Sequence, residues 1–156
     1  MKALIESFYI AFNKLDADAM TACYHDEIVF EDPAFGILKG KHAKNMWRML
    51  CESQKGKDFK ITFSNIQAND LIGSAHWEAF YTFSKTGRKV HNVIDAHFEF
   101  KDGKIIKHTD DFNLYKWSRQ AMGLKGLLLG NTQFFKARLN AQTKHLLSKF
   151  EEKMNT

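Results

Sequence analysis

The sequence predicts one α+β domain, in which a curved β-sheet wraps over helices and a helical extension follows. Helical spacing of apolar residues dominates as far as residue 52, and alternating β-rich runs fill residues 59–114. A sheet of consecutive strands must bury one face, so it has to curl over the preceding helices to form a core. At 156 residues the chain is long enough for one well-filled core.

The first part of the chain is predicted to be mainly helical. Apolar residues recur at helical spacing in each expected helix, and Asp16 or Asp18 can cap the second one. Pro33 ends the expected strand, because proline cannot donate to a central ladder. The elements expected here are helices over residues 2–14, 19–24 and 41–52, and a strand over residues 28–32 that is followed by a loop through Gly36 and Gly40.

Four strands are predicted after residue 58. Apolar and polar side chains alternate along them, and turn residues separate them. The Asp102-Gly103 pair is the strongest of these turn signals, since it is typical of a tight hairpin. The expected strands cover residues 59–66, 71–84, 90–100 and 104–114.

Residues 116–156 are predicted to be a basic helical extension of the domain formed by residues 1–115. The extension holds eight Lys/Arg and two Asp/Glu, whereas residues 1–115 hold 15 and 16. The net charge of +5 therefore belongs to the extension, which argues against a nucleic-acid-binding body. The extension is expected to pack as a helix across its own domain or a dimer mate. The alternative is a weak peripheral membrane contact through residues 127–153.

The composition points to a cytoplasmic protein. Cys23 and Cys51 are too few for a disulfide framework and are expected in the packing of the helices. The N-terminal apolar run is interrupted by Glu6 and Asn13, so it does not read as a signal peptide, and no run approaches the ~20 apolar residues of a membrane span.

Ionisable residues stand out in the hairpin formed by residues 91–112. Charged groups are costly to bury, so their presence in a strand indicates a partner, a site or a solvated face. Side-chain alternation groups them into three faces, which are either the walls of a site or solvated surfaces. These faces are His91, Val93, Asp95 and His97; His108, Asp110 and Phe112; and His76, Glu78 and Phe80.

Several motifs resemble the ketosteroid isomerases of the nuclear-transport-factor-2-like (SnoaL-like) superfamily. They are Tyr24-His25-Asp26 followed by Val29-Phe30-Glu31-Asp32-Pro33, then Val93-Ile94-Asp95, and Gly103-Lys104-Ile105. The resemblance covers about residues 1–115. It implies a cone-shaped fold, with three N-terminal helices packed on a strongly curved, mixed and mostly antiparallel sheet, and a homodimer through the outer sheet face.

The isomerase resemblance implies roles for four residues. Asp32 falls on the general base and Asp95 on the oxyanion-hole acid, which must stay protonated in an apolar pocket. Tyr24 matches a supporting tyrosine and Phe112 a pocket aromatic. The oxyanion tyrosine itself aligns with Phe8, which has no hydroxyl.

Polyketide cyclases and limonene-epoxide-hydrolase-like enzymes of the same superfamily suggest a second set of roles. They use an acid on the last strand, which Asp110 resembles in placement, and His108 would tune it. His76 and Glu78 resemble the hydrolase's partner residues in placement. Trp47, Phe80 and Val93 are expected to contribute to the pocket wall.

The sequence therefore predicts a cofactor-independent isomerase or cyclase that transfers protons on a small hydrophobic carbonyl or polycyclic substrate. The alternatives are a non-catalytic module that binds a small hydrophobic molecule, and an epoxide-hydrolase-like hydrolase using Asp110. No metal is expected, although His91, Asp95 and His97 have the residue types of a metal site. The expected catalytic residues are Asp32, Asp95, Asp110 and His108, and the expected ligand-binding residues are Tyr24, Trp47, His76, Glu78, Phe80, Val93 and Phe112.

Overall fold

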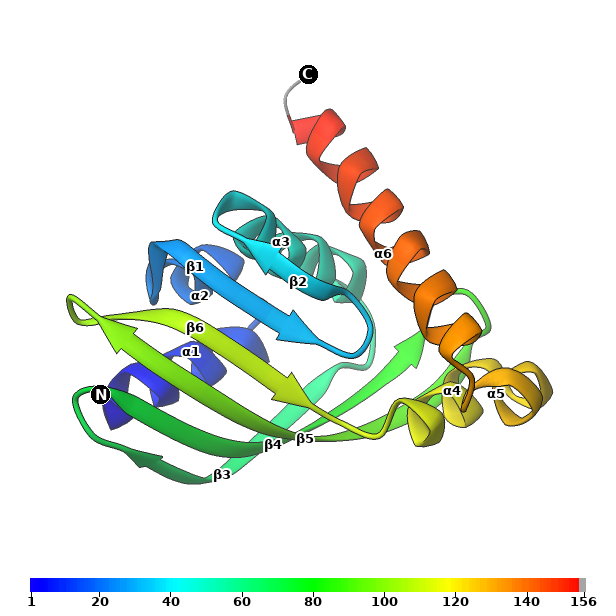
Figure 1. Ribbon diagram of the computed structural model, residues 1–156, viewed down its shortest axis with the longest axis horizontal. Helices are drawn as coiled ribbons and strands as arrows, with labels where there is room; N and C mark the ends of the chain where they lie inside the picture. Colours follow the sequence, from blue (N-terminus) through cyan, green and yellow to red (C-terminus); the bar gives the residue numbers. More distant parts are fainter. Residues whose placement is uncertain (155–156) are drawn as a thin grey trace.

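A computed structural model describes residues 1–154 and shows a single six-stranded sheet with helices on its inner side (Figure 1). The strand order is β2-β1-β6-β5-β4-β3. The strands are β1 (Tyr24–Asp32), β2 (Gly36–Lys39), β3 (Lys60–Ala68), β4 (Ile72–Phe83), β5 (Arg88–Lys101) and β6 (Lys104–Asp111). The helices are α1 (Lys2–Asn13), α2 (Ala17–Ala22), α3 (Lys41–Gln54), α4 (Leu114–Met122), α5 (Leu124–Leu129) and α6 (Gln133–Met154).

The sheet is mixed, which confirms the predicted fold class. β1 runs parallel to β6, and every other neighbouring pair is antiparallel. β2 was expected to be part of a loop, because it has only four residues and glycines flank it. It pairs with β1 through a tight turn in which Gly36 has a φ of 68°, a conformation that favours glycine.

The three N-terminal helices fill the hollow of the curved sheet. α1 and α3 contribute large apolar residues to a core that they share with the inner faces of β1, β4, β5 and β6. Burying such side chains contributes roughly 1.5–3 kcal/mol each, so this layer is a main source of stability. The fully buried members include Ile5, Phe8, Tyr9, Phe30, Met46 and Ile94.

Strand pairing shows which face of β5 points inward, and it corrects one prediction. Ala96 pairs with Asp110, so residue 96 shares the inner face with Asp110 while residue 95 points outward. Asp95 pairs with Asp111 on the outer face, and its side chain is 71% exposed. The expectation that Asp95 joins His108 and Asp110 in one cavity is therefore wrong.

The C-terminal helices lie against one end of the domain (Figure 1). α4 and α5 meet closely, because a Cβ on Gly126 would lie 1.9 Å from the carbonyl oxygen of Ser118. α6 then runs back over the molecule, where Asn140 donates hydrogen bonds to the carbonyl oxygens of Pro33 and Ala34. Near its end, Glu151 accepts hydrogen bonds from side chains of α3. Within residues 1–154, no helix combines the length and apolarity required to cross a membrane.

Candidate active site

A cavity of about 550 Å³ lies between the inner face of the sheet and helices α3, α4 and α6. This volume suits a small organic ligand. Most of its wall is apolar or aromatic, including Phe30, Trp47, Trp77, Phe112 and Trp117. Asp32 and Asp110 are the carboxyl groups that line it within residues 1–154. The walls therefore favour an apolar ligand that presents a polar group to these two carboxyls.

Asp32 ends β1 and turns the chain toward β2. Its Oδ1 accepts hydrogen bonds from the backbone N–H groups of Ala34 at 2.9 Å and Phe35 at 2.6 Å. Burial raises the pKa of Asp32 to about 7, the hydrogen bond from Phe35 opposes this shift, and the charge of Asp110 adds to it. Asp32 thus holds the turn and also places a carboxyl group that titrates near neutral pH in the cavity wall.

Asp110 lies on β6, directly next to Asp32 in the sheet. The parallel ladder pairs Phe30 with His108 and Glu31 with Thr109, so the next residue along each strand is an aspartate. Asp110 is only 4% exposed. Its Oδ1 accepts two hydrogen bonds, one from Nε2 of His108 at 3.0 Å and one from Nε1 of Trp77 at 3.1 Å.

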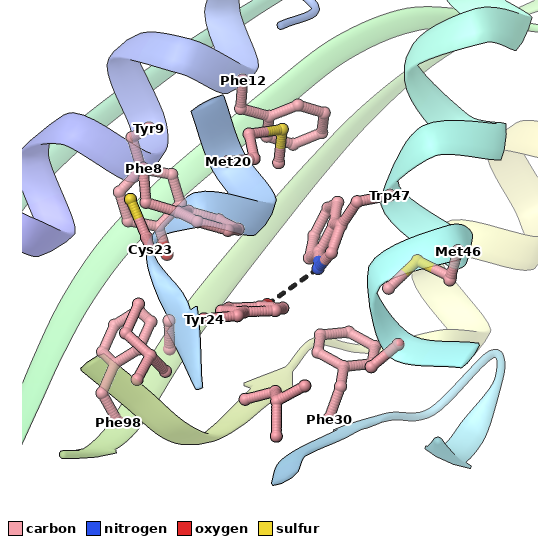
Figure 2. Packing of buried hydrophobic residues seen from close by; sticks show 14 of the residues in the cluster. Phe8, Tyr9, Phe12, Met20, Cys23, Tyr24, Phe30, Met46, Trp47 and Phe98 are labelled. Atoms are coloured by element: carbon pink, nitrogen blue, oxygen red, sulfur yellow. Dashed lines mark hydrogen bonds between the residues drawn. The ribbon is translucent and has the colours of Figure 1, made fainter. Parts of the chain in front are cut away.

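A buried chain of hydrogen bonds supports Asp110 from behind. Nε1 of Trp47 donates to the Tyr24 hydroxyl at 2.7 Å (Figure 2), and that hydroxyl lies 2.7 Å from Nδ1 of His108. Since Tyr24 already accepts from Trp47, its own proton is available to His108 Nδ1. His108 then carries its proton on Nε2 and donates it to Asp110. In this series of hydrogen bonds each residue donates to the next, and the last donor, His108, reaches the carboxyl group of Asp110.

Aromatic rings hold His108 in place. The imidazole has no exposed surface, and its aromatic neighbours come from α1, α3, β1 and β5. Phe98 lies 4.4 Å away between ring centroids, Phe30 lies 5.3 Å away, Phe8 5.4 Å, and the Trp47 ring is stacked at 6.0 Å. Figure 2 shows these aromatic residues gathered around Tyr24. Phe8 therefore packs against His108, at the position where the isomerase resemblance places a tyrosine.

The predicted site residues divide between the two faces of the sheet. Asp32, Trp47, Asp110 and Phe112 line the cavity, with Tyr24 and His108 in the layer behind it. For the other five residues the prediction is wrong, because the pairing of β4 with β5 places their side chains on the outer face of the sheet. These residues are His76, Glu78, Phe80, Val93 and Asp95.

The outer residues form a cluster of their own. His76 bonds Asp95 at 2.8 Å, and His91 bonds Glu78 at 2.5 Å while it stacks on Phe80 at 4.3 Å. The hydrogen bond from His91 lowers the pKa of Glu78. Because the whole cluster faces away from the cavity, His76 and Glu78 cannot act in the cavity as the expected hydrolase partners. Among residues 1–154, no three His, Cys, Asp or Glu side chains are placed to hold a metal ion together.

Sequence reasoning missed two contributors to the site. Trp77 is not among the residues expected at the site, yet its indole N–H is one of the two donors to Asp110. The Trp indole commonly seeks an acceptor when buried, and this preference is the signal that could have identified it. The second contributor is α6, whose residues Leu139, Thr143, Leu146 and Phe150 close the cavity.

Comparisons with known proteins place this geometry in context. Residues 5–108 match the family described as the SnoaL-like domain. No curated protein matches the chain. An LEH-like epoxide hydrolase from M. tuberculosis is 23% identical, with 82% of this chain and 89% of that chain covered and a TM-score of 0.58.

Two further solved structures share the fold. A candidate polyketide cyclase from Xanthomonas campestris pv. campestris is 22% identical over 76% of this chain and 93% of that chain, with a TM-score of 0.61. An NTF2-like protein of unknown function from Cytophaga hutchinsonii is 19% identical over 72% and 99%, with a TM-score of 0.58. At these identities the likeness shows a common NTF2-like fold.

Proposed function

Because the chain belongs to the SnoaL-like domain family, we propose that it is an acid–base enzyme that moves a proton on a small hydrophobic carbonyl or polycyclic substrate. One observation carries the proposal: two adjacent carboxyl groups line an apolar cavity, and burial raises the pKa of one of them, Asp32, to about 7. Such a pair can hold one proton donor and one proton acceptor at the same pH. An isomerisation or an intramolecular cyclisation is the reaction class that this pair suits.

Asp110 serves as the base in this proposal. Two N–H donors, from His108 and Trp77, converge on Oδ1 and hold the carboxyl group in one orientation. The other carboxyl oxygen, Oδ2, receives no hydrogen bond from residues 1–154. It is not one of the fully buried polar atoms without a partner in this part of the chain, so it is accessible from the cavity. It is therefore available to accept a proton from a carbon next to the substrate's carbonyl group.

Asp32 serves as the acid. With a pKa of about 7, it is substantially protonated at neutral pH and can donate to the carbonyl oxygen as negative charge develops there. This assignment exchanges the roles expected from the isomerase resemblance, in which Asp32 is the base. The exchange follows from burial, which raises the pKa of Asp32 to about 7 although the backbone N–H groups of Phe35 and Ala34 oppose the shift.

His108 and Tyr24 act as positioning residues. His108 Nε2 fixes the orientation of the Asp110 carboxylate, and Tyr24 fixes the tautomer of His108. Neither side chain lines the cavity, so neither is expected to touch substrate.

The structural neighbours support a cyclase-type reaction over epoxide hydrolysis. Several are described as candidate polyketide cyclases and one as an LEH-like epoxide hydrolase. The residues expected to act as hydrolase partners, His76 and Glu78, lie on the outer face, whereas the proton-transfer pair Asp32 and Asp110 lies inside.

Exchange of carbon-bound hydrogen in D₂O tests the proposal without a known substrate. The probe is 2-tetralone, a bicyclic ketone, and deuterium incorporation beside its carbonyl is followed by proton NMR. We expect the wild type to accelerate exchange, Asp110→Asn to lose roughly 10²-fold or more of that acceleration, and Asp32→Asn to lose less. NMR chemical shifts of the residues that line the cavity report whether 2-tetralone binds there. If it binds but its hydrogen exchange stays at the rate in buffer, the protein is a non-catalytic binding module and this proposal is wrong.

A further inference from the structure

Exposed leucines are concentrated on the short helix α5. Among residues 1–154, twelve large apolar side chains are exposed, and four of them belong to this six-residue helix. Leu124 and Leu128 are each 76% exposed, and with Leu127 they share one helix face, because residues three and four apart are neighbours on a helix surface. We call this group the leucine patch; it consists of Leu124, Leu127, Leu128 and Leu129.

The side of α5 opposite the leucine patch is fixed to α4. Gly126 is buried against Ser118, whose hydroxyl donates to the Gly126 carbonyl oxygen at 3.3 Å. The Tyr115 hydroxyl donates to the carbonyl oxygen of Leu127, also at 3.3 Å. Figure 1 shows α5 as the outermost element at this end of the molecule. The exposed leucines therefore lie on a projecting helix that α4 holds in place.

Positively charged side chains flank the leucine patch. The guanidinium group of Arg88 lies 3.4 Å from the position that a Cβ would take on Gly123, the residue directly before α5. The guanidinium group of Arg119 lies 5.6 Å from the centroid of the Tyr115 ring, whose hydroxyl is bonded to the backbone of α5. Lys125 is exposed on α5 itself. The fold thus brings three positive charges from three elements to one apolar projection.

We propose that the leucine patch docks this protein onto the surface of an anionic lipid bilayer. Apolar side chains on a projecting helix enter the boundary between headgroups and acyl chains, and adjacent Lys and Arg side chains bind the anionic headgroups. The proposal goes beyond the acid–base function, since the leucine patch lies outside the cavity wall.

The charge of this region favours a bilayer over a second copy of the chain. Residues 112–150 hold seven Lys/Arg and no Asp/Glu. A second copy docked on the same patch by two-fold symmetry would present the same surface. Arg88, Arg119 and Lys125 would then face their own counterparts, so like charges would repel, whereas anionic headgroups supply the opposite charge.

Co-sedimentation of the full chain with vesicles tests the proposal. One vesicle type contains equal parts of phosphatidylglycerol and phosphatidylcholine, and the other contains phosphatidylcholine alone. We expect the wild type to bind the anionic vesicles roughly tenfold more tightly than the neutral ones, and added salt to reduce this difference. Leu124→Gln with Leu128→Gln should weaken binding to anionic vesicles by about tenfold or more. Arg119→Gln with Lys125→Gln should weaken it by roughly tenfold and leave binding to neutral vesicles within twofold.

A matched control removes exposed apolar side chains outside the leucine patch. Ile37→Gln with Leu71→Gln changes two of them, on β2 and directly before β4, and should leave binding to both vesicle types within twofold. Leu71 lies at the opposite end of β4 from the turn where Thr86 donates to the carbonyl oxygen of Ala121 in α4. The variant Leu124→Gln with Leu128→Gln should keep its rate of exchange on 2-tetralone, because neither side chain lines the cavity.

Three results would overturn the proposal: no binding of the wild type to anionic vesicles, equal binding to both vesicle types, or equal losses in the leucine variant and its control. Sedimentation velocity without lipid examines the other occupant. If the leucine variant turns a dimer into a monomer and the wild type binds no vesicles, the leucine patch is an interface between copies and the proposal is wrong. If the wild type binds anionic vesicles but exchanges no ketone, only the acid–base function fails.

Discussion

The Tyr24 hydroxyl lies 2.7 Å from Nδ1 of His108 and also accepts the indole proton of Trp47 at 2.7 Å. Tyr24 comes from β1, His108 from β6 and Trp47 from α3, so one hydroxyl joins three elements inside the core. Because Tyr24 has a single proton to give, the tautomer of His108 follows from this contact. The orientation of Asp110 in the cavity therefore depends on a residue that does not line it.

Tyr24→Phe should uncouple this arrangement. It leaves the indole N–H of Trp47 and Nδ1 of His108 buried without a partner, which costs about 1–3 kcal/mol of unfolding free energy per group. Urea denaturation measures the loss, and the ¹⁵N shifts of the His108 ring report whether its proton moves from Nε2 to Nδ1. Tyr115→Phe is the control, since its hydroxyl makes only a 3.3 Å bond to Leu127 near the surface. An unchanged His108 tautomer in Tyr24→Phe would contradict the positioning role.

Asp32 should make stability fall as pH rises. Its pKa is about 7 in the folded chain against 3.8 for an unperturbed aspartate, so between these values the folded state holds a proton that the unfolded state has lost. The resulting stabilisation is complete below about pH 4 and is lost as pH rises through 7. Three pH units correspond to at most about 4 kcal/mol.

The variant Asp32→Asn isolates this effect, because asparagine can still accept the bonds from Ala34 and Phe35 but cannot ionise. Urea unfolding at several pH values should show the variant gaining stability relative to wild type from pH 4 to pH 8. A constant difference across that range would mean that Asp32 has an ordinary pKa. For the wild type, kcat/KM for ketone exchange should decline above about pH 7 as the acid loses its proton.

The sequence predicted the elements better than the faces. Alternation within β5 correctly grouped Asp95 with His91 and Val93, but alternation alone cannot say which group is buried. That choice depends on the register with β6, where Ala96 rather than Asp95 meets Asp110, and register is a long-range property. The role of α6 in closing the cavity could not be predicted from local sequence patterns either. The apolar residues of a helix show that it packs against something but not which part of the fold it covers. Asp110 and Asp32 were found because a motif resemblance supplied the long-range information that periodicity lacks.

The outer-face cluster should be dispensable for proton transfer. Glu78→Gln with Asp95→Asn removes both carboxylates that bind His76 and His91, and both lie on the surface turned away from the cavity. Surface ion pairs of this kind contribute little to stability. We expect the rate of ketone exchange and the affinity for the apolar fluorescent probe N-phenyl-1-naphthylamine to stay within twofold of those of the wild type. A loss of activity comparable to that of Asp110→Asn would restore Asp95 as a site residue.

Contacts between α6 and the β1–β2 turn should control access to the cavity. Asn140 donates to the carbonyl oxygens of Pro33 and Ala34 at 2.9 and 2.6 Å, and Thr143 donates to Ala34 at 3.0 Å, directly after Asp32. Asn140→Ala with Thr143→Val removes these bonds and should cost about 1–3 kcal/mol of local stability. Amide hydrogen exchange in α6 should accelerate while β4 and β5 stay protected.

The same double variant should bind N-phenyl-1-naphthylamine more weakly, by roughly tenfold, because the apolar wall that α6 supplies is held less firmly. His145→Ala, on the exposed side of α6, is the control and should change neither exchange nor affinity. Faster exchange in α6 with unchanged probe affinity would show that the helix covers the cavity without contributing to binding. Weaker binding together with faster exchange would identify α6 as the element through which ligands enter, since the sheet and α3 that form the remaining walls are the more deeply buried part of the core.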